Sequence, residues 1–267
     1  MKYQQIQAVP KLQPYIHHFG VLENDQASAH TQTFKIIADG CPGLIFQENP
    51  NSFLDNHNNK LPQLFLHGLT SSFSQKTVKG NYYNIGVYCK PHALKSIFGI
   101  NANELTDTHV SLNEVMKNDL SEQLLYEHSV DKRIDIITDF LCRQIDKNKH
   151  RENLKAVYAI RKINTDTVED LSAIHSALNI SERSLERIFK TNIGISPKLF
   201  FRICRFQAAL DDIRTNKLNS LTGIAHQHSY ADQSHFIRDF KAFTGVSPKQ
   251  FLSHAAELAI NFPEWKS

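Results

Sequence analysis

The sequence predicts an α+β fold: a small β-barrel or β-sandwich at the N-terminus, followed by an all-α domain with two helix-turn-helix motifs. Three observations lead to this prediction. Short apolar segments separated by turn residues recur before about residue 110, and helical periodicity replaces them afterwards. One helical unit then occurs twice, with equivalent residues 51 positions apart. A unit of this length is too small to bury a core alone, so the two copies are expected to share one.

The N-terminal part contains four segments typical of β-strands, at 34–38, 43–47, 64–68 and 82–89. They are rich in β-branched and aromatic residues, and Asp-Gly, Asn-Pro-Asn and Gly-Asn sequences that favour turns lie between them. We therefore expect residues 1–110 to form a β-rich domain, whose interior is either a ligand-binding cavity or a filled core. The candidate ligand-binding residues are Phe46, Phe65, His67 and Tyr88.

Residues 111–150 are predicted to form a helical connector. Its longest helix is expected at 131–147, where apolar residues recur at helical spacing. This stripe consists of Ile134, Ile137, Leu141 and Ile145. It can pack on the β-rich domain or on a second copy of the chain, and the sequence leaves both open. The polar stretch 146–153 marks the expected boundary to a C-terminal domain at 151–267.

Each copy of the repeated unit has the pattern of a short helix, a tight turn and a second, amphipathic helix that ends at a glycine. In the first copy Asn179 stands at the turn, where a residue that tolerates positive φ is needed. Ser181 is expected to cap the helix 182–192. Ser229 and Asp232 take the corresponding places in the second copy.

Each copy is followed by a serine and a proline, Ser196-Pro197 and Ser247-Pro248. A proline at the first helical position loses no hydrogen bond, so both pairs are expected to open a new helix. The helix that begins at Pro197 runs to about Thr215 and is expected to act as a rigid spacer between the two units.

Two helix-turn-helix units on a rigid spacer favour binding in the major groove of DNA, which accommodates an α-helix. The residues that point to a family are Leu185–Phe189, Gly194–Pro197, Ile224–Ala225, Tyr230–Phe236, Asp239–Lys241 and Gly245–Pro248. Through them, about the last 100 residues resemble the DNA-binding domain of the AraC/XylS family of transcription regulators. The resemblance implies seven helices, two helix-turn-helix motifs and a long connecting helix.

The chain departs from the family pattern at three positions. The turn glycine common in the family is Asn179 in one copy and Ser229 in the other, and a usual small residue is His175. Asn and Ser both suit turns, so the fold prediction stands. The segments 10–19 and 90–94 also resemble the N-terminal sensor domain of one branch of these regulators, for which no general ligand is assigned.

The resemblance implies that the second helix of each copy contacts double-stranded DNA. Arg187 and Arg238 occupy equivalent places and match positions that contact a base or the backbone; an arginine can do either. Glu186 can accept a hydrogen bond from cytosine or remain a solvated surface residue. The predicted DNA-contacting residues are Arg183, Ser184, Glu186, Arg187, Lys190, Gln233, Ser234, His235, Ile237 and Arg238.

Charge is distributed unevenly along the chain. From residue 151 onward there are 16 Lys and Arg against 12 Asp and Glu, whereas residues 1–150 hold 14 against 15. A basic excess confined to the C-terminal part suits contact with phosphates. The four cysteines are widely spaced and the 14 histidines form no HExxH motif, so we expect free thiols and no metal site or cofactor.

The remaining expectations concern location and partners. No apolar run reaches membrane-spanning length and the N-terminus lacks the apolar core of a signal peptide, so we expect a cytoplasmic protein without membrane contact. Besides DNA, its partners would be an unknown small-molecule effector, RNA polymerase and a second copy in a homodimer. We expect no enzymatic activity. The first alternative for the N-terminal half is a protein-interaction module, and the second is an enzyme.

Overall fold

The β-rich part consists of two open antiparallel sheets that pack face to face. The computed structural model describes residues 2–25, 32–50, 52–55, 57–165, 171–215 and 220–253. The larger sheet has the order β1-β2-β8-β4-β6-β9 and the smaller one the order β3-β7-β5. The strands are β1 Lys2–Gln7, β2 Ile16–Asn24, β3 Gln32–Ile36, β4 Gly43–Gln47, β5 Phe53–Leu54, β6 Leu64–His67, β7 Ser74–Val78, β8 Tyr82–Cys89 and β9 His109–Ser111.

The larger sheet is covered on both faces. On its inner face, side chains such as Phe34 of β3 and Tyr82 of β8 form a small aromatic core between the two sheets. On its outer face lie the helices α1 Leu112–Val115, α2 Leu120–Tyr126 and α3 Val130–Asn148, with the π-helix Leu94–Phe98. The stripe of α3 predicted from the sequence, Ile134, Ile137, Leu141 and Ile145, is buried in this second core. The stripe therefore packs on the β-rich part of the same chain.

The junction to the C-terminal part is tied to the β-rich part through side chains. Asn148, at the end of α3, is buried and its Nδ2 donates to the carbonyl oxygen of Ile97 at 2.7 Å. Arg151 donates to the carbonyl oxygen of Gly99 at 3.2 Å. The predicted polar stretch thus contains two residues, Asn148 and Arg151, that hydrogen-bond to the β-rich part.

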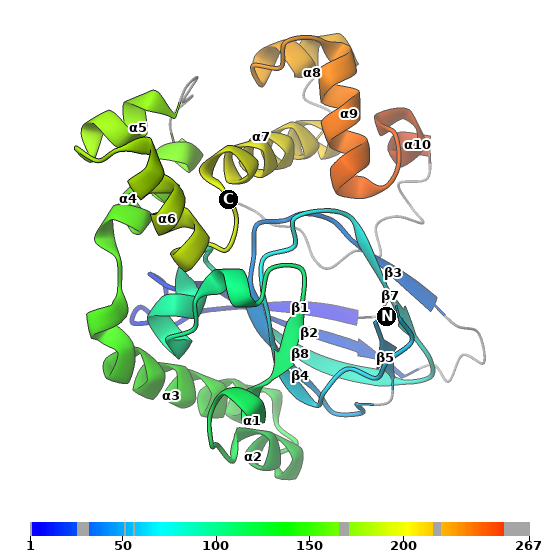
Figure 1. The fold of residues 1–267 in the computed structure, drawn as a ribbon. Coiled ribbons are helices and arrows are strands. Elements are labelled where there is room, and N and C mark those ends of the chain that lie inside the picture. Colours follow the sequence, from blue (N-terminus) through cyan, green and yellow to red (C-terminus); the bar gives the residue numbers. More distant parts are fainter. Residues whose placement is uncertain are drawn as a thin grey trace.

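Seven helices lie between residues 154 and 253 in the described part of the chain, as predicted. They are α4 Leu154–Thr165, α5 Ser172–Ala177, α6 Glu182–Asn192, α7 Pro197–Arg214, α8 Leu221–Gln227, α9 Gln233–Thr244 and α10 Pro248–Ser253. The helix pairs α5–α6 and α8–α9 lie toward opposite ends of α7 (Figure 1). Phe200 and Phe206 of α7 are fully buried in a core that includes residues of both pairs, which confirms that the two copies share one core.

Candidate functional site

The first helix-turn-helix unit consists of α5 and α6. Asn179 between them has a φ of 49°, as the turn requires. The hydroxyl of Ser181 accepts a hydrogen bond from the N–H of Ser184 and caps α6, because this donor has no partner within the helix. Leu185 and Phe189 are buried against α7 and α4, so the opposite side of α6 faces solvent. Of the predicted contact residues on α6, Ser184 is half-buried, and four are exposed: Arg183, Glu186, Arg187 and Lys190.

The second unit, α8 and α9, repeats this arrangement. Ser229 at the turn has a φ of 53°, and the carboxylate of Asp232 accepts from the N–H of His235 at 2.7 Å. Phe236 and Phe240 are fully buried. Of the predicted contact residues, Gln233, Ser234 and Arg238 are exposed, whereas His235 and Ile237 are half-buried.

A charged cluster that the sequence analysis missed attaches α9 to α7. Asp239 of α9 has a side chain only 2% exposed, and its carboxylate accepts from Arg202 at 2.7 Å and from Arg205 at 3.3 Å. The guanidinium of Arg205 also lies 3.9 Å from the centre of the Tyr230 ring and donates to the carbonyl oxygen of Ser229. The cluster therefore fixes the turn and the second helix of this unit on the connecting helix.

The β-rich part contacts both units at equivalent glycines. Gly194 ends the first unit and Gly245 the second, and both have positive φ, 101° and 76°. The hydroxyl of Thr106 donates to the carbonyl oxygen of Gly194 at 2.9 Å. A Cβ added to Gly245 would lie 2.8 Å from the ring of Phe73. Glycine permits both the backbone conformation and this close approach.

Two backbone hydrogen bonds join the C-terminal end of α9 to the β-rich part. The N–H of Phe73 donates to the carbonyl oxygen of Ala242, and the N–H of Ala38 to that of Phe243. The last carbonyl groups of a helix have no partner within it, so these bonds satisfy acceptors that would otherwise need water. Gln207 of α7 also donates to the carbonyl oxygen of Ala38. Ala38 and Leu69 are part of the core of the C-terminal helices.

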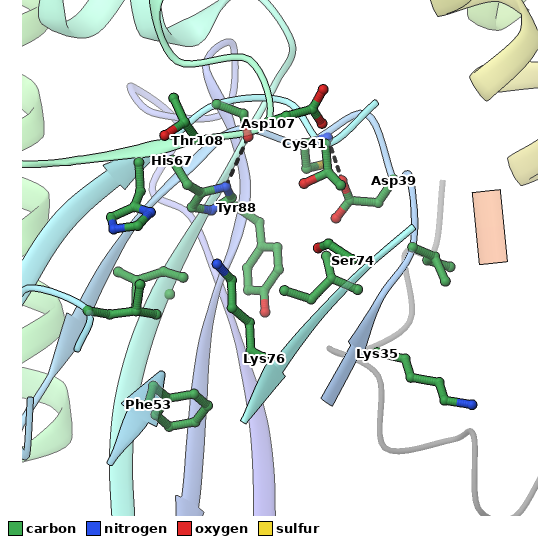
Figure 2. A pocket seen from close by; sticks show the side chains of 18 of the residues that line it. Lys35, Asp39, Cys41, Phe53, His67, Ser74, Lys76, Tyr88, Asp107 and Thr108 are labelled. Atoms are coloured by element: carbon green, nitrogen blue, oxygen red, sulfur yellow. Dashed lines mark hydrogen bonds between the residues drawn. The ribbon is translucent and has the colours of Figure 1, made fainter. Parts of the chain in front are cut away.

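A cavity of about 330 Å³ lies between the two sheets and extends to α7 (Figure 2). Phe65, His67 and Tyr88, which the sequence analysis selected, line it. Phe46 is absent from its lining, because its ring lies in the outer core, 5.6 Å from the guanidinium of Arg133. Residues of β3, β7 and α7 that carry no recognisable motif also line the cavity: Lys35, Lys76, Gln207 and Arg214.

Burial shifts the pKa of several groups in the cavity wall. It lowers the pKa of His67 to about 4, although a hydrogen bond between Nδ1–H and the carbonyl oxygen of Gly68 opposes the shift. Burial also lowers the pKa of Lys76 and raises that of Tyr88. It raises the pKa of Asp39 to about 6, against the effect of the Cys41 N–H, which donates to its carboxylate. At neutral pH His67 is therefore uncharged, and its Nε2 can accept a hydrogen bond.

Metal-binding groups are absent from the described residues: no three His, Cys, Asp or Glu side chains come close enough to hold an ion. Cys41, Cys89, Cys142 and Cys204, all within the described residues, are not joined by disulfide bonds, and the first two are buried. Among the helices that the structure describes, none is both long and apolar enough to cross a membrane.

Comparison with known protein families and structures gives matches to both parts of the chain. Residues 174–254 match a helix-turn-helix domain family, and residues 4–111 match a domain of unknown function, DUF6597. ToxT from Vibrio cholerae has a similar fold, with a TM-score of 0.50 at 13% sequence identity, over 92% of this chain and 99% of ToxT.

Curated relatives are transcription regulators. An uncharacterized HTH-type transcriptional regulator of Staphylococcus aureus is 27% identical over 161 residues, which make up 60% of this chain and 20% of that protein. The raffinose operon transcriptional regulatory protein RafR of Pediococcus pentosaceus is 30% identical over 106 residues, 39% of this chain and 37% of RafR. The chain thus spans about a fifth of the staphylococcal protein and little more than a third of RafR.

Proposed function

We propose that this chain, whose C-terminal part is an AraC-type helix-turn-helix domain, is a sequence-specific DNA-binding regulator of transcription that responds to a small molecule. The observation that carries the proposal is the duplicated helix pair. Both second helices, α6 and α9, bury their apolar side in one core and present polar side chains to solvent. Two such helices on one connecting helix suit successive major-groove segments, about one helical turn or 34 Å apart.

Arg187 and Arg238 are the residues to which we assign base or phosphate contacts. They are 51 positions apart, stand at the same place in the two units, and are both exposed. A guanidinium can pair bidentately with guanine or bind a phosphate. Lys190 is exposed one turn further along α6 and suits a phosphate contact. His235 has less freedom, because its Nε2 lies 3.9 Å from the Asp239 carboxylate and its ring packs edge-on against Tyr230.

The response to a small molecule is supported by the segments that connect the cavity with the DNA-binding helices. Phe73 and Thr108 line the cavity. Phe73 packs on Gly245 at the end of α9, and Thr106, two residues before Thr108, binds Gly194 after α6. A ligand that moves these segments would therefore change how both recognition helices are held. Such coupling requires the ligand to bind the two arrangements with different affinity.

We further propose that the chain divides functionally at residues 1–110, 111–150 and 151–267, into sensor, connector and DNA-binding domain. It would act in the cytoplasm, where bacterial chromosomal DNA lies. RNA polymerase and a second copy of the chain are the protein partners that such a regulator would use. A sensor without a ligand would instead be a protein-interaction module, and this alternative predicts no thermal shift with any small molecule.

Selection of bound oligonucleotides with the full chain tests the proposal. Arg187→Ala and Arg238→Ala should each lower affinity for the selected sequence by about 1–3 kcal/mol. The matched control is Arg143→Ala, because Arg143 is exposed on α3, away from both units, and should leave affinity unchanged. Wild-type affinity should also fall steeply with salt as phosphates are neutralised. Failure to enrich any sequence, or arginine variants that bind like the control, would overturn the proposal.

A further inference from the structure

Two buried amide groups stand side by side in the wall of the cavity. Gln47 of β4 and Asn84 of β8 are directly paired across the sheet and are 1% and 5% exposed. Both line the cavity. The Nε2 of Gln47 donates to the carbonyl oxygens of Leu61 at 2.9 Å and Pro62 at 2.7 Å. Because carbonyl oxygens only accept, the orientation of this amide is fixed and Oε1 is its free atom.

These two amides leave two hydrogen-bond acceptors without a donor among the described residues. In that part of the chain, neither Oε1 of Gln47 nor Oδ1 of Asn84 accepts a hydrogen bond. A buried polar atom without a partner is costly, and such atoms in a native fold call for an explanation. Cβ atoms of directly paired residues lie about 5 Å apart, so one small group with two donors can reach both oxygens.

The rest of the cavity restricts what that group can be. Lys76 extends from the opposite sheet toward His67 and Tyr88 (Figure 2), and among the described contacts its ammonium makes no hydrogen bond. A cationic donor would be repelled by Lys76, and a carboxylate brings no donor to the two oxygens. A hydroxyl both donates and accepts, so it can donate to an amide oxygen and accept from the Lys76 ammonium. Apolar side chains line the part of the cavity near these amides: Ile45, Phe53, Leu61 and Phe65.

Two paired glycines make room for the tyrosine rings beside the cavity. Gly86 of β8 lies opposite Gly20 of β2 and lines the cavity. A Cβ on Gly86 would lie 3.2 Å from the ring of Tyr88, and a Cβ on Gly20 2.7 Å from the hydroxyl of Tyr3. The cavity volume, about 330 Å³, is at the lower end of the range for small-molecule sites.

We infer that the cavity binds a neutral molecule with two neighbouring hydroxyl groups on a largely apolar body, and that the hydroxyls donate to Gln47 Oε1 and Asn84 Oδ1. The inference rests on the proposed sensor role and names the chemical class of its ligand. Catechol and trans-1,2-cyclohexanediol carry the required pair of hydroxyls. Phenol and cyclohexanol lack one hydroxyl, and benzoate replaces the pair by a carboxylate.

The test measures the melting temperature of the full chain with each of these five probes. Both diols should raise it by mass action, and the corresponding mono-alcohols should bind at least tenfold more weakly. Benzoate should give no shift. Because this series uses the wild-type chain, its result does not depend on the folding of any variant. Equal binding of diols, mono-alcohols and benzoate, or no shift with either diol, would overturn the inference.

Asn84→Leu supplies a second, independent measurement. Leucine has the shape of asparagine without its polar atoms, and no hydrogen bond of the Asn84 side chain is lost within the described residues. The variant should melt at a higher temperature than the wild type without ligand, and bind the diols at least tenfold more weakly. Wild-type diol binding by the variant would contradict the inference.

The same probes separate this inference from the proposed function. If benzoate raises the melting temperature and changes operator binding whereas the diols do neither, the ligand class is wrong and the sensor role stands. If no DNA sequence is bound, the regulator proposal fails whatever the diols do.

Discussion

Gly245→Ala tests the contact between the β-rich part and the second recognition helix. Gly245 has a φ of 76°, and a new Cβ would lie 2.8–2.9 Å from three carbon atoms of the Phe73 ring. The backbone conformation alone should cost about 1 kcal/mol with an L side chain. Displacing a packed ring should add about 1–3 kcal/mol, as overpacking does elsewhere. We therefore expect a loss of about 2–4 kcal/mol in the free energy of unfolding, measured by urea denaturation.

Gly80→Ala is the matched control for this variant. Gly80 has nearly the same φ, 71°, and nothing lies within 4 Å of an added Cβ. The free energy of unfolding of Gly80→Ala should fall only by the cost of the backbone conformation, about 1 kcal/mol. In a Phe73→Ala background the loss caused by Gly245→Ala should fall to that of the control, because the ring is gone. Equal losses for Gly245→Ala and Gly80→Ala in the wild-type background would refute the contact between Phe73 and Gly245.

Three further outcomes are expected. Asp239→Asn should destabilise the chain by about 3 kcal/mol, because it leaves the guanidinium groups of Arg202 and Arg205 without their carboxylate. The control Asp135→Asn, at an exposed site on α3, should change the free energy of unfolding little. Urea denaturation measures both variants. Ser229→Val should lower stability by about 2 kcal/mol, because a β-branched residue tolerates positive φ poorly, whereas Ser229→Gly should leave stability unchanged or raise it by up to about 1 kcal/mol; equal melting temperatures of the two variants would contradict this. Stability should fall as pH drops from 6.5 toward 4, because burial lowers the pKa of five histidines and the unfolded chain then binds more protons. The raised pKa of Asp39 opposes this trend, and unfolding free energies that stay flat over this range would refute the burial of uncharged histidines. The five histidines are His17, His18, His67, His92 and His109.

The helical half could be predicted from the sequence because its signals are local. Capping by Ser181 and Asp232, the turn positions of Asn179 and Ser229, and the buried phenylalanines follow from spacing along the chain, and the structure confirms them. The cluster around Asp239 could not be predicted this way. Its partners Arg202 and Arg205 lie 37 and 34 positions away, so only the packing of α9 on α7 brings the charges together.

The β-rich half was predicted less completely. β4 and β8 were found with their correct ends because both are apolar runs between turn residues. β1 is mostly exposed and β7 carries a single valine among polar residues, so neither has the alternation that indicates a strand. Asn84 could have been identified as a cavity residue from the sequence, because it is a lone amide in an otherwise apolar and aromatic strand. The structure places it on the face that lines the cavity.

The base-by-base specificity of the two arginine variants tests the central claim most directly. Every position of the selected DNA sequence is substituted in turn, and binding is measured for the wild type, Arg187→Ala and Arg238→Ala. We expect each variant to relax specificity in its own window of base pairs, with the two windows about 10 base pairs apart. Relaxation of the same positions by both variants, or of positions in one window only, would contradict a reader with two recognition helices.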